Sequence, residues 1–175
     1  MSKIGKKGIN TKNICKLIND FSLLVKKKKF VIEKPFYFII KENKIFIRID
    51  KKYRNIKKYR SMWGTFRANL NNLILGCHKK FKKIMKVEGI GYYIKEKYKG
   101  LLEINCGYSH FVYVKINKNI KYKIENNIIT LRSFDKSILG MVCQTIRKKF
   151  KKSPYKKKGI FFLGEKVFLK TKKKK

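Results

Sequence analysis

The same order of predicted elements occurs twice along this chain, with strand-like runs followed by one amphipathic helix. The two helical stretches end alike, in His78–Phe81 and in Arg147–Phe150, and aligning these ends places Leu70 on Leu139. A repeated block of this kind indicates a duplicated structural unit. We therefore expect an α+β fold of two duplicated small domains, each an antiparallel sheet packed on one helix. The expected domains are residues 1–82 and 83–175, with the first 34 residues only weakly patterned.

The first domain contains one clear strand pair and one clear helix. Residues 36–40 and 45–49 are strand-like, and Glu42-Asn43 between them predicts a hairpin. Thr65 is expected to cap a helix whose apolar residues share one face. Apolar residues also recur at helical spacing over residues 14–25, which predicts a further short helix.

The second domain is expected to contain several short strands before its helix. The predicted strands are 84–96 (bent at Gly89 and Gly91), 101–106, 110–116, 121–124 and 128–132. Asp135 is expected to cap the second helix. Beyond that helix, two apolar runs at 160–163 and 166–170 predict two more short strands.

Positive charge constrains what this fold binds. The chain has 48 Lys plus Arg against 10 Asp plus Glu, a formal net charge of +38. Self-repulsion at that imbalance weakens an isolated compact state, so we expect a polyanion as a structural partner. The apolar share of 43% is too high for a disordered basic protein, so a core forms and the charge lies on its surface. Nucleic acid is the leading partner. An anionic membrane is the weaker one, because no apolar run approaches the ~20 residues of a membrane helix.

The densest basic segment runs from Arg147 to Lys175, where lysines bracket every apolar and aromatic piece. This pattern suits a surface laid against many phosphates. A plain solubilising tail is the alternative, but it would not need Pro154, Tyr155 and Gly159 between two β-prone runs. Lysine suits phosphates as a flexible point charge, whereas base reading favours arginine, of which the chain has only six. We therefore expect recognition of RNA shape and backbone rather than of base sequence.

The residues expected to contact RNA belong mainly to this segment, with a few from loops and helices elsewhere. They are Arg147, Lys148, Lys151, Lys152, Ser153, Pro154, Tyr155, Lys156, Lys157, Lys158, Lys166, Lys170, Lys172, Lys173, Ser109, His110, Arg60 and Arg67. Two interpretations stay open for Tyr155, which either stacks on a base or ribose or packs beside Pro154 against the last helix.

Neither catalysis nor a bound metal is expected. Ser109 and His110 are adjacent, and in an extended segment adjacent side chains point to opposite faces, which is poor geometry for proton transfer. Gly89-Ile90-Gly91 lacks the third glycine and the following helix of a dinucleotide loop. The four cysteines are far apart and form no zinc-binding spacing, so we expect reduced, mostly buried thiols. The sequence thus predicts a protein that is not an enzyme, has no cofactor and binds no metal.

Five segments carry a resemblance to a known family in their order and spacing: 64–70, 89–92, 102–110, 135–140 and 154–160. Over about the last two-thirds of the chain they resemble the universal L-six family of large-subunit ribosomal proteins. The first 60 residues match only in general strand pattern. Two positions depart from the family: Phe111 stands where the family usually has proline, and Lys157 where it usually has glycine. The second change adds charge where RNA is expected.

The resemblance implies two related α+β domains bound to large-subunit ribosomal RNA. It places them near the base of the factor-binding stalk and the sarcin-ricin loop, beside neighbouring large-subunit ribosomal proteins and near the docking site of translational GTPases, without a catalytic role. The main alternative is a general nucleic-acid-binding or compacting protein, which shares the charge but does not need the ordered set of segments.

The abundance of Lys, Ile, Asn, Phe and Tyr indicates A+T-rich codons. The start of the chain has neither an apolar signal core nor the composition of a transit peptide, so we expect an unprocessed N-terminus. These two observations favour a mitochondrial ribosome. A plastid-type organelle or a reduced endosymbiotic bacterium is the alternative.

Overall fold

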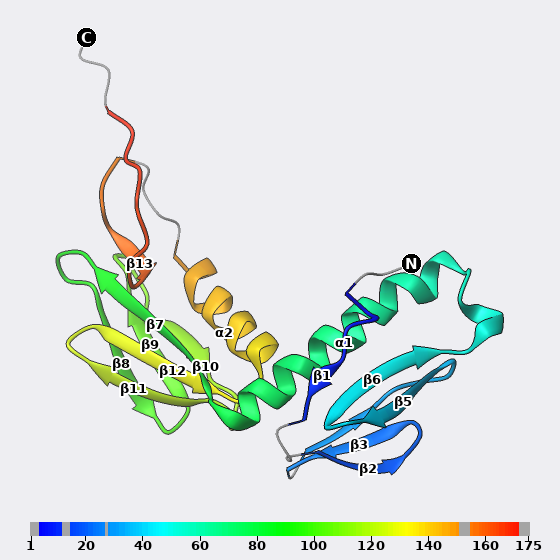
Figure 1. Cartoon of the computed structure of the whole chain (residues 1–175). Helices are drawn as coiled ribbons and strands as arrows, with labels where there is room; N and C mark the ends of the chain where they lie inside the picture. Colours follow the sequence, from blue (N-terminus) through cyan, green and yellow to red (C-terminus); the bar gives the residue numbers. More distant parts are fainter. Residues whose placement is uncertain (1–3, 12–14, 27, 151–154, 172–175) are drawn as a thin grey trace. The chain divides into compact units, whose positions relative to one another are not determined.

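The computed structural model describes residues 4–11, 15–26, 28–150 and 155–171 (Figure 1). The chain divides into two compact units, unit 1 at Met1–Lys79 and unit 2 at Lys80–Lys175. Each unit has one α-helix, antiparallel strands and its own hydrophobic core. The predicted α+β class is therefore confirmed. The boundary expected after residue 82 falls inside the first strand of unit 2.

Unit 1 consists of two three-stranded antiparallel sheets and one long helix. Its elements are β1 (Ile9–Asn10), β2 (Cys15–Asn19), β3 (Ser22–Val25), β4 (Lys28–Val31), β5 (Phe36–Lys41), β6 (Lys44–Ile49), the 3-10 helix η1 (Lys51–Tyr53) and α1 (Lys57–His78). The strand orders are β1-β6-β5 and β2-β3-β4. Both sheets and α1 contribute side chains to one core.

The β5–β6 hairpin has the turn that the sequence predicts. Lys41 pairs with Lys44, and the two residues between them, Glu42 and Asn43, have φ of 45° and 60°. Two central residues with positive φ make a turn whose twist matches that of the flanking strands. The predicted hairpin is confirmed.

The short helix predicted over residues 14–25 is wrong. From Cys15 onward the segment forms the hairpin β2–β3, in which Leu17 pairs with Leu23 and Cys15 with Val25. Leu23 and Val25 are fully buried, as the alternation of a strand requires, whereas Leu17 is exposed. Helical and strand spacing cannot be separated in so short a run, and pairing of β3 with β4 decides the outcome. Residues 12–14 lie outside the described residues.

The first helix is longer than predicted at its start and shorter at its end. It begins at Lys57 after the N-cap Ile56, so Thr65 is inside the helix, and its hydroxyl donates to the Ser61 carbonyl at 3.3 Å. Trp63 fixes the early turns because its ring is buried and its Nε1 donates to the Ile47 carbonyl at 2.7 Å. The helix ends at His78. Phe81, predicted to lie on the helix, begins a strand.

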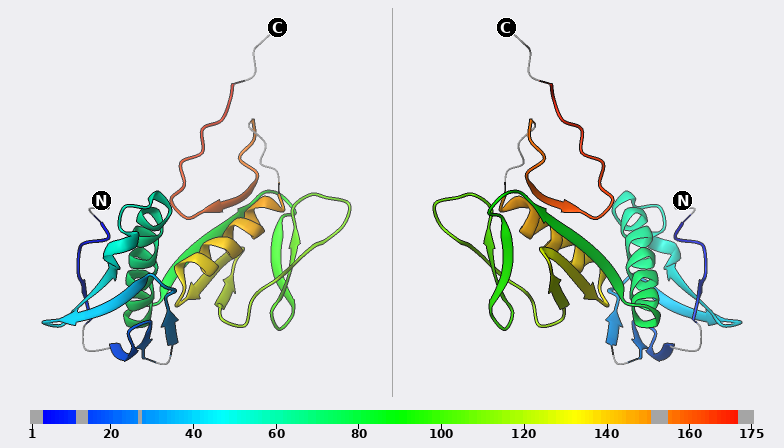
Figure 2. Two further views of the ribbon diagram at one scale, coloured as in Figure 1. Left: turned by 90° about the vertical axis from the view of Figure 1, so that its right-hand side faces the viewer. Right: turned by 90° about the vertical axis from the view of Figure 1, so that its left-hand side faces the viewer.

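Unit 2 contains a four-stranded and a three-stranded antiparallel sheet and one helix. Its elements are β7 (Phe81–Glu88), β8 (Tyr93–Tyr98), β9 (Leu101–Asn105), β10 (Val112–Lys115), β11 (Lys121–Glu125), β12 (Ile128–Ser133), α2 (Lys136–Lys148) and β13 (Gly159–Phe162). The strand orders are β11-β12-β7-β13 and β10-β9-β8. Helix α2 packs along β7 and β12 (Figure 2). Side chains from α2 and from both sheets form one hydrophobic core. The N-cap prediction is confirmed, because an Asp135 carboxylate oxygen accepts from the amide of Ser137 at 2.8 Å.

Two strand predictions in unit 2 need correction. The single strand predicted at 84–96 is two strands, β7 and β8, because the chain reverses between Gly89 (φ 147°) and Gly91 (φ 74°). Of the two strands predicted near the end of the chain, β13 forms. Residues 166–170 do not pair with any strand of the described chain, and Phe168 is 89% exposed. β13 is an edge strand of its sheet, yet residues 166–170 do not pair with it, so β-propensity alone does not make this run a strand.

Candidate nucleic-acid interface

An internal ion pair ties the basic C-terminal segment to α2. The Arg147 guanidinium lies 2.5 Å from Glu165 Oε1 and 5.2 Å from the centre of the Phe162 ring. The other Glu165 oxygen accepts from the Phe162 amide at 3.0 Å. Arg147 was predicted to contact RNA, but in the structure its charge is largely compensated by Glu165. Among the lysines around it, Lys157 also has a carboxylate partner, Glu88, whereas Lys156 and Lys166 are exposed and form no ion pair in the described chain.

Strand β13 fixes where the lysines of residues 156–158 lie. Gly159 pairs with Glu88 and Phe162 with Met85, so the lysines that precede β13 lie at the end of β7. Lys157 Nζ is 3.5 Å from one Glu88 oxygen, and Lys86 Nζ is 3.2 Å from the other. Burial raises the pKa of Glu88, but the hydrogen bonds and charges of these two lysines outweigh it, and its pKa is lower than usual.

Most other predicted contacts in this segment are exposed cations, and some are not described. Lys148, Lys156, Lys166 and Lys170 are exposed, as is the Tyr155 ring at 48%. Exposed lysine ammonium groups are available to phosphates, and Tyr155 remains accessible for stacking. Lys151, Lys152, Ser153, Pro154, Lys172 and Lys173 lie outside the described residues.

The loop after β9 lies against the end of α2 through aromatic rings. Tyr108 is 6.0 Å from Phe150 and stacks on His110 at 5.9 Å with an angle of 18° between the rings. Gly107 has φ 77°, and a Cβ there would lie 2.9 Å from the Tyr92 hydroxyl, so only glycine fits. The loop and Lys149 together line an open pocket. The fold thus brings His110 to the start of the basic segment.

Arg60 and Arg67, predicted as RNA contacts, hold loops of unit 1. Arg60 Nε donates to the Arg54 carbonyl at 3.0 Å, ahead of α1. Arg67 Nε donates to the Lys7 carbonyl at 2.9 Å and fixes the segment before β1. Their donors are partly used within the protein. In the structure as described, Ser109 and His110 make no hydrogen bond to each other.

Strand register reveals a row of cations that sequence reasoning missed. Lys121 on β11 pairs with Arg132 on β12, and Arg132 pairs with Lys82 on β7. All three side chains are exposed on the face opposite the core. No carboxylate of the described residues pairs with them, since Glu125 pairs with Lys123 and Glu88 with Lys86 further along the sheet.

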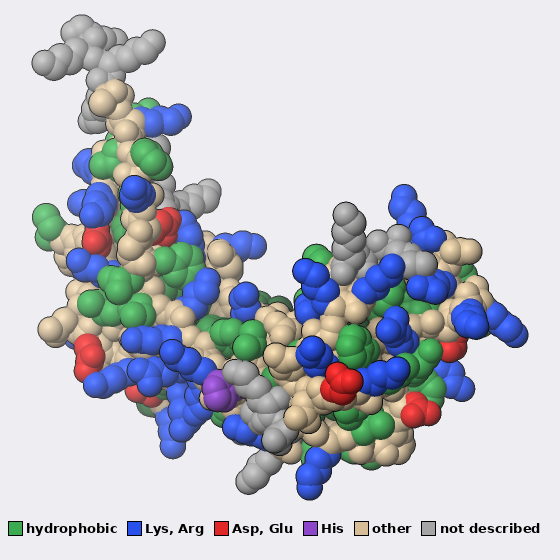
Figure 3. Space-filling model, viewed as in Figure 1, with side chains coloured by type: hydrophobic (Ala, Val, Ile, Leu, Met, Phe, Trp, Pro, Cys, Tyr) green, Lys and Arg blue, Asp and Glu red, His purple; other side chains and the backbone are tan. Residues whose placement is uncertain are grey.

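Like charges directly opposite each other across strands are destabilising. An anion that lies across the row would remove this repulsion. The three residues are separated by up to 50 positions in sequence. The only signal for them in the sequence is the alternation of apolar and polar residues around Arg132, which indicates that its side chain points away from the core. Lysine and arginine also clearly outnumber acidic side chains on the visible surface (Figure 3).

The cysteines offer no chemistry to this interface. Cys77, Cys106 and Cys143 are buried and all four thiols are free, in line with the expected reduced state. Burial raises the pKa of Cys106 to about 11, so this thiol stays protonated and unreactive near neutral pH. No group of three or more His, Cys, Asp or Glu in the described chain could hold a metal ion.

Comparison with known proteins gives a consistent result along nearly the whole chain. No family model matches it. It is similar to the large ribosomal subunit protein uL6 of Nautilia profundicola, with 31% identity over 98% of this chain and 97% of the relative. The large ribosomal subunit protein uL6c of Phaeodactylum tricornutum is also 31% identical over the same shares. The uL6 protein of Parabacteroides distasonis is 35% identical over 63% of each chain.

Proposed function

Since this chain belongs to the uL6 family of large ribosomal subunit proteins, we propose that it is a structural constituent of the large ribosomal subunit and binds its ribosomal RNA. Unit 2 supplies the main binding surface through its basic C-terminal segment and the row of Lys121, Arg132 and Lys82. The observation that carries the RNA contact is this in-register row, because phosphates that lie across it relieve the repulsion between its like charges.

The contact is made mainly with phosphates. The exposed cations around β13 are lysines, while Arg147, the arginine nearest to them, is paired with Glu165. Lysine binds phosphate as a point charge and reads base edges poorly compared with arginine. RNA shape and backbone therefore position the protein, and Tyr155 and His110 add stacking where an unpaired base comes near.

The position in the subunit follows the family expectation. The protein lies near the base of the factor-binding stalk and the sarcin-ricin loop, with neighbouring ribosomal proteins around it. There it supports the region in which translational GTPases dock, without a catalytic role of its own.

Among the described residues, neither helix has the length and apolar character that crossing a bilayer demands.

The protein belongs to a ribosome of plastid or bacterial type. The relatives named above come from bacteria and from Phaeodactylum tricornutum, whose protein has the plastid-type name uL6c. They support a plastid-type organelle more than the mitochondrion that codon usage and the composition of the N-terminus favour. The mitochondrial location stays a prediction.

Sedimentation of the tagged protein from a cell extract tests this function. We expect it to sediment with large subunits and to recover large-subunit ribosomal RNA, identified by sequencing. Purified protein should then bind a transcript of that RNA more tightly than duplex DNA of equal length at the same salt concentration. Equal affinity for the two would instead support a general nucleic-acid-compacting protein.

A further inference from the structure

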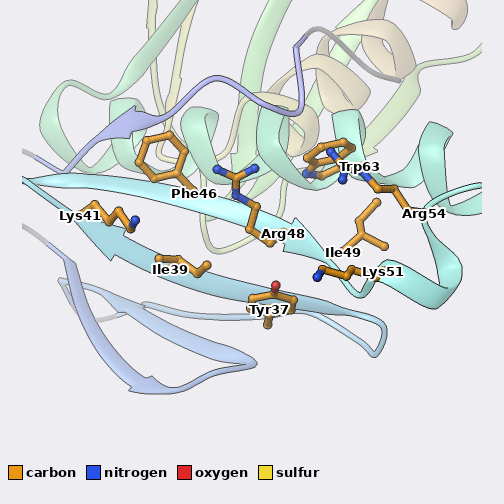
Figure 4. A pocket seen from close by; sticks show the side chains of 9 residues that line it. All are labelled: Tyr37, Ile39, Lys41, Phe46, Arg48, Ile49, Lys51, Arg54 and Trp63. Carbon is orange, nitrogen blue, oxygen red and sulfur yellow. The ribbon is translucent and has the colours of Figure 1, made fainter.

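We infer that unit 1 carries a second RNA-binding site, a groove on the sheet that holds the phosphate backbone of a nucleic-acid strand. The groove encloses about 280 Å³ beside β5 and β6. Its cationic lining consists of Lys41, Arg48, Lys51 and Arg54 (Figure 4). The inference rests on the proposed function in that the strand is ribosomal RNA.

Strand alternation places Lys41 and Arg48 on the face opposite the core, while Lys51 lies in η1 and Arg54 caps its end, just after β6. Phe36 and Phe38 of β5 are buried, so Tyr37 between them points to the other face. Tyr37 pairs directly with Arg48 of β6, and the next pair on this face joins Ile39 with Phe46. The groove thus has an aromatic and aliphatic floor with cations beside it.

Arg48 is held in an orientation suited to an anion. Its guanidinium carbon lies 5.6 Å from the centre of the Phe46 ring, and its side chain is exposed. Stacking of this kind fixes the plane of the guanidinium and leaves its edge donors directed away from the ring. A guanidinium edge matches two phosphate oxygens at once.

None of the described residues that line the groove carries a negative charge. In the described part of the chain, Lys41, Arg48 and Lys51 form no ion pair with a carboxylate. Lys41 also lies directly opposite Lys44 across the hairpin, which adds like-charge repulsion. An external anion relieves this repulsion.

The floor identifies the anion as a nucleic-acid strand. The Tyr37 and Phe46 rings lie beside the cations, and such a combination accommodates bases or riboses next to their phosphates. A small inorganic anion would use the charges but not the rings. The Phe46 ring also packs closely against Gly8, where an added Cβ would lie 2.8 Å from it.

A salt titration of RNA binding tests the groove. The probe is an in-vitro transcript of the large-subunit ribosomal RNA from the same organism, bound by the full-length chain. Replacing Lys41, Arg48 and Lys51 together with Gln should lower the slope of log affinity against log salt by about 2, because each lost phosphate contact removes about 0.7 to 0.9. Thermal unfolding followed by circular dichroism checks that the variant stays folded, because Trp63, the one tryptophan, itself lines the groove.

A control variant removes the same charge from unit 1 outside the groove, with Lys16, Lys29 and Lys34 replaced by Gln. We expect it to keep the wild-type slope, and an equal loss in both variants would overturn the inference. Ultraviolet cross-linking of the wild-type complex should also recover RNA-linked peptides from β5 or β6. If cross-links come only from unit 2, the groove is wrong while the proposed function stands; if no ribosomal RNA is bound at all, the proposed function fails as well.

Discussion

The Arg147 guanidinium lies 2.5 Å from the Glu165 carboxylate, and this contact joins the end of α2 to the turn after β13. Both side chains are less than one-third exposed, so water screens the pair only partly. Glu165 also accepts from the Phe162 amide. Residues 159–165 of the basic segment are thereby attached to the core of unit 2, whereas residues 166–170 pair with no strand of the described chain.

Replacing Glu165 with Gln should loosen β13. The change leaves the Arg147 charge without its partner and should cost about 1–2 kcal/mol of local stability. Hydrogen exchange of the β13 amides, measured by mass spectrometry, should become faster. The matched control is Glu125→Gln, whose ion pair with Lys123 is mostly exposed, and its effect should be near zero. Equal exchange in both variants would show that the Arg147 contact does not hold the segment.

Replacing Lys156, Lys157 and Lys158 together with Gln should flatten the salt dependence of RNA binding. Three lost phosphate contacts lower the slope of log affinity against log salt by about 2 to 3. Filter binding to the ribosomal RNA transcript at several salt concentrations measures this slope. The Lys16, Lys29 and Lys34 variant is the control of equal charge. An unchanged slope in the first variant would remove this segment from the interface.

Replacing Arg132 with Gln should stabilise the free protein and weaken RNA binding. Arg132 lies between Lys121 and Lys82, so its removal abolishes two like-charge pairs, worth about 0.2–1 kcal/mol each. Lys123→Gln on β11 removes an attractive pair with Glu125 and should not stabilise. Thermal unfolding and RNA affinity, measured for both variants, distinguish the loss of a repulsive pair from the loss of an attractive one. A destabilised Arg132 variant would contradict the repulsive row.

The stability contributed by Glu88 should depend on pH. Its pKa in the folded protein is below the usual 4.5, so the unfolded chain takes up the proton first as the pH falls. The stabilisation is therefore complete above pH ~5 and is lost as the pH drops through the folded pKa. The difference in unfolding temperature between the wild type and Glu88→Gln should shrink between about pH 6 and pH 3. A constant difference over this range would mean that the lysines around Glu88 do not lower its pKa.

The sequence predicted local structure correctly where the conformation depends on residues that are close together in the chain. The turn at Glu42-Asn43 and the cap at Asp135 depend on residues a few positions apart, and both predictions are confirmed. The Thr65 cap was wrong because burial of Trp63 extends the helix two turns earlier than its apolar face suggests. A local pattern cannot show that a distant side chain is anchored in the core.

The sequence predicted which segment of the candidate interface is rich in positive charge. It did not predict how the cations of the interface are arranged in space. The lysines around Tyr155 stand out in the sequence, whereas Lys82, Arg132 and Lys121 meet only through strand register. Arg147 belongs to the same basic run as Lys148, yet its guanidinium is paired within the protein.

By itself, the sequence determined the α+β class, the family, and a partner that carries negative charge, because periodicity, ordered motifs and net charge are properties of the chain as written. Only the tertiary structure decided that residues 15–25 form a hairpin, that Arg147 serves the fold, and that cations align in a row and a groove. Those outcomes depend on contacts between residues far apart in the chain. The geometry of these contacts is set by strand pairing and by burial of apolar side chains in the core.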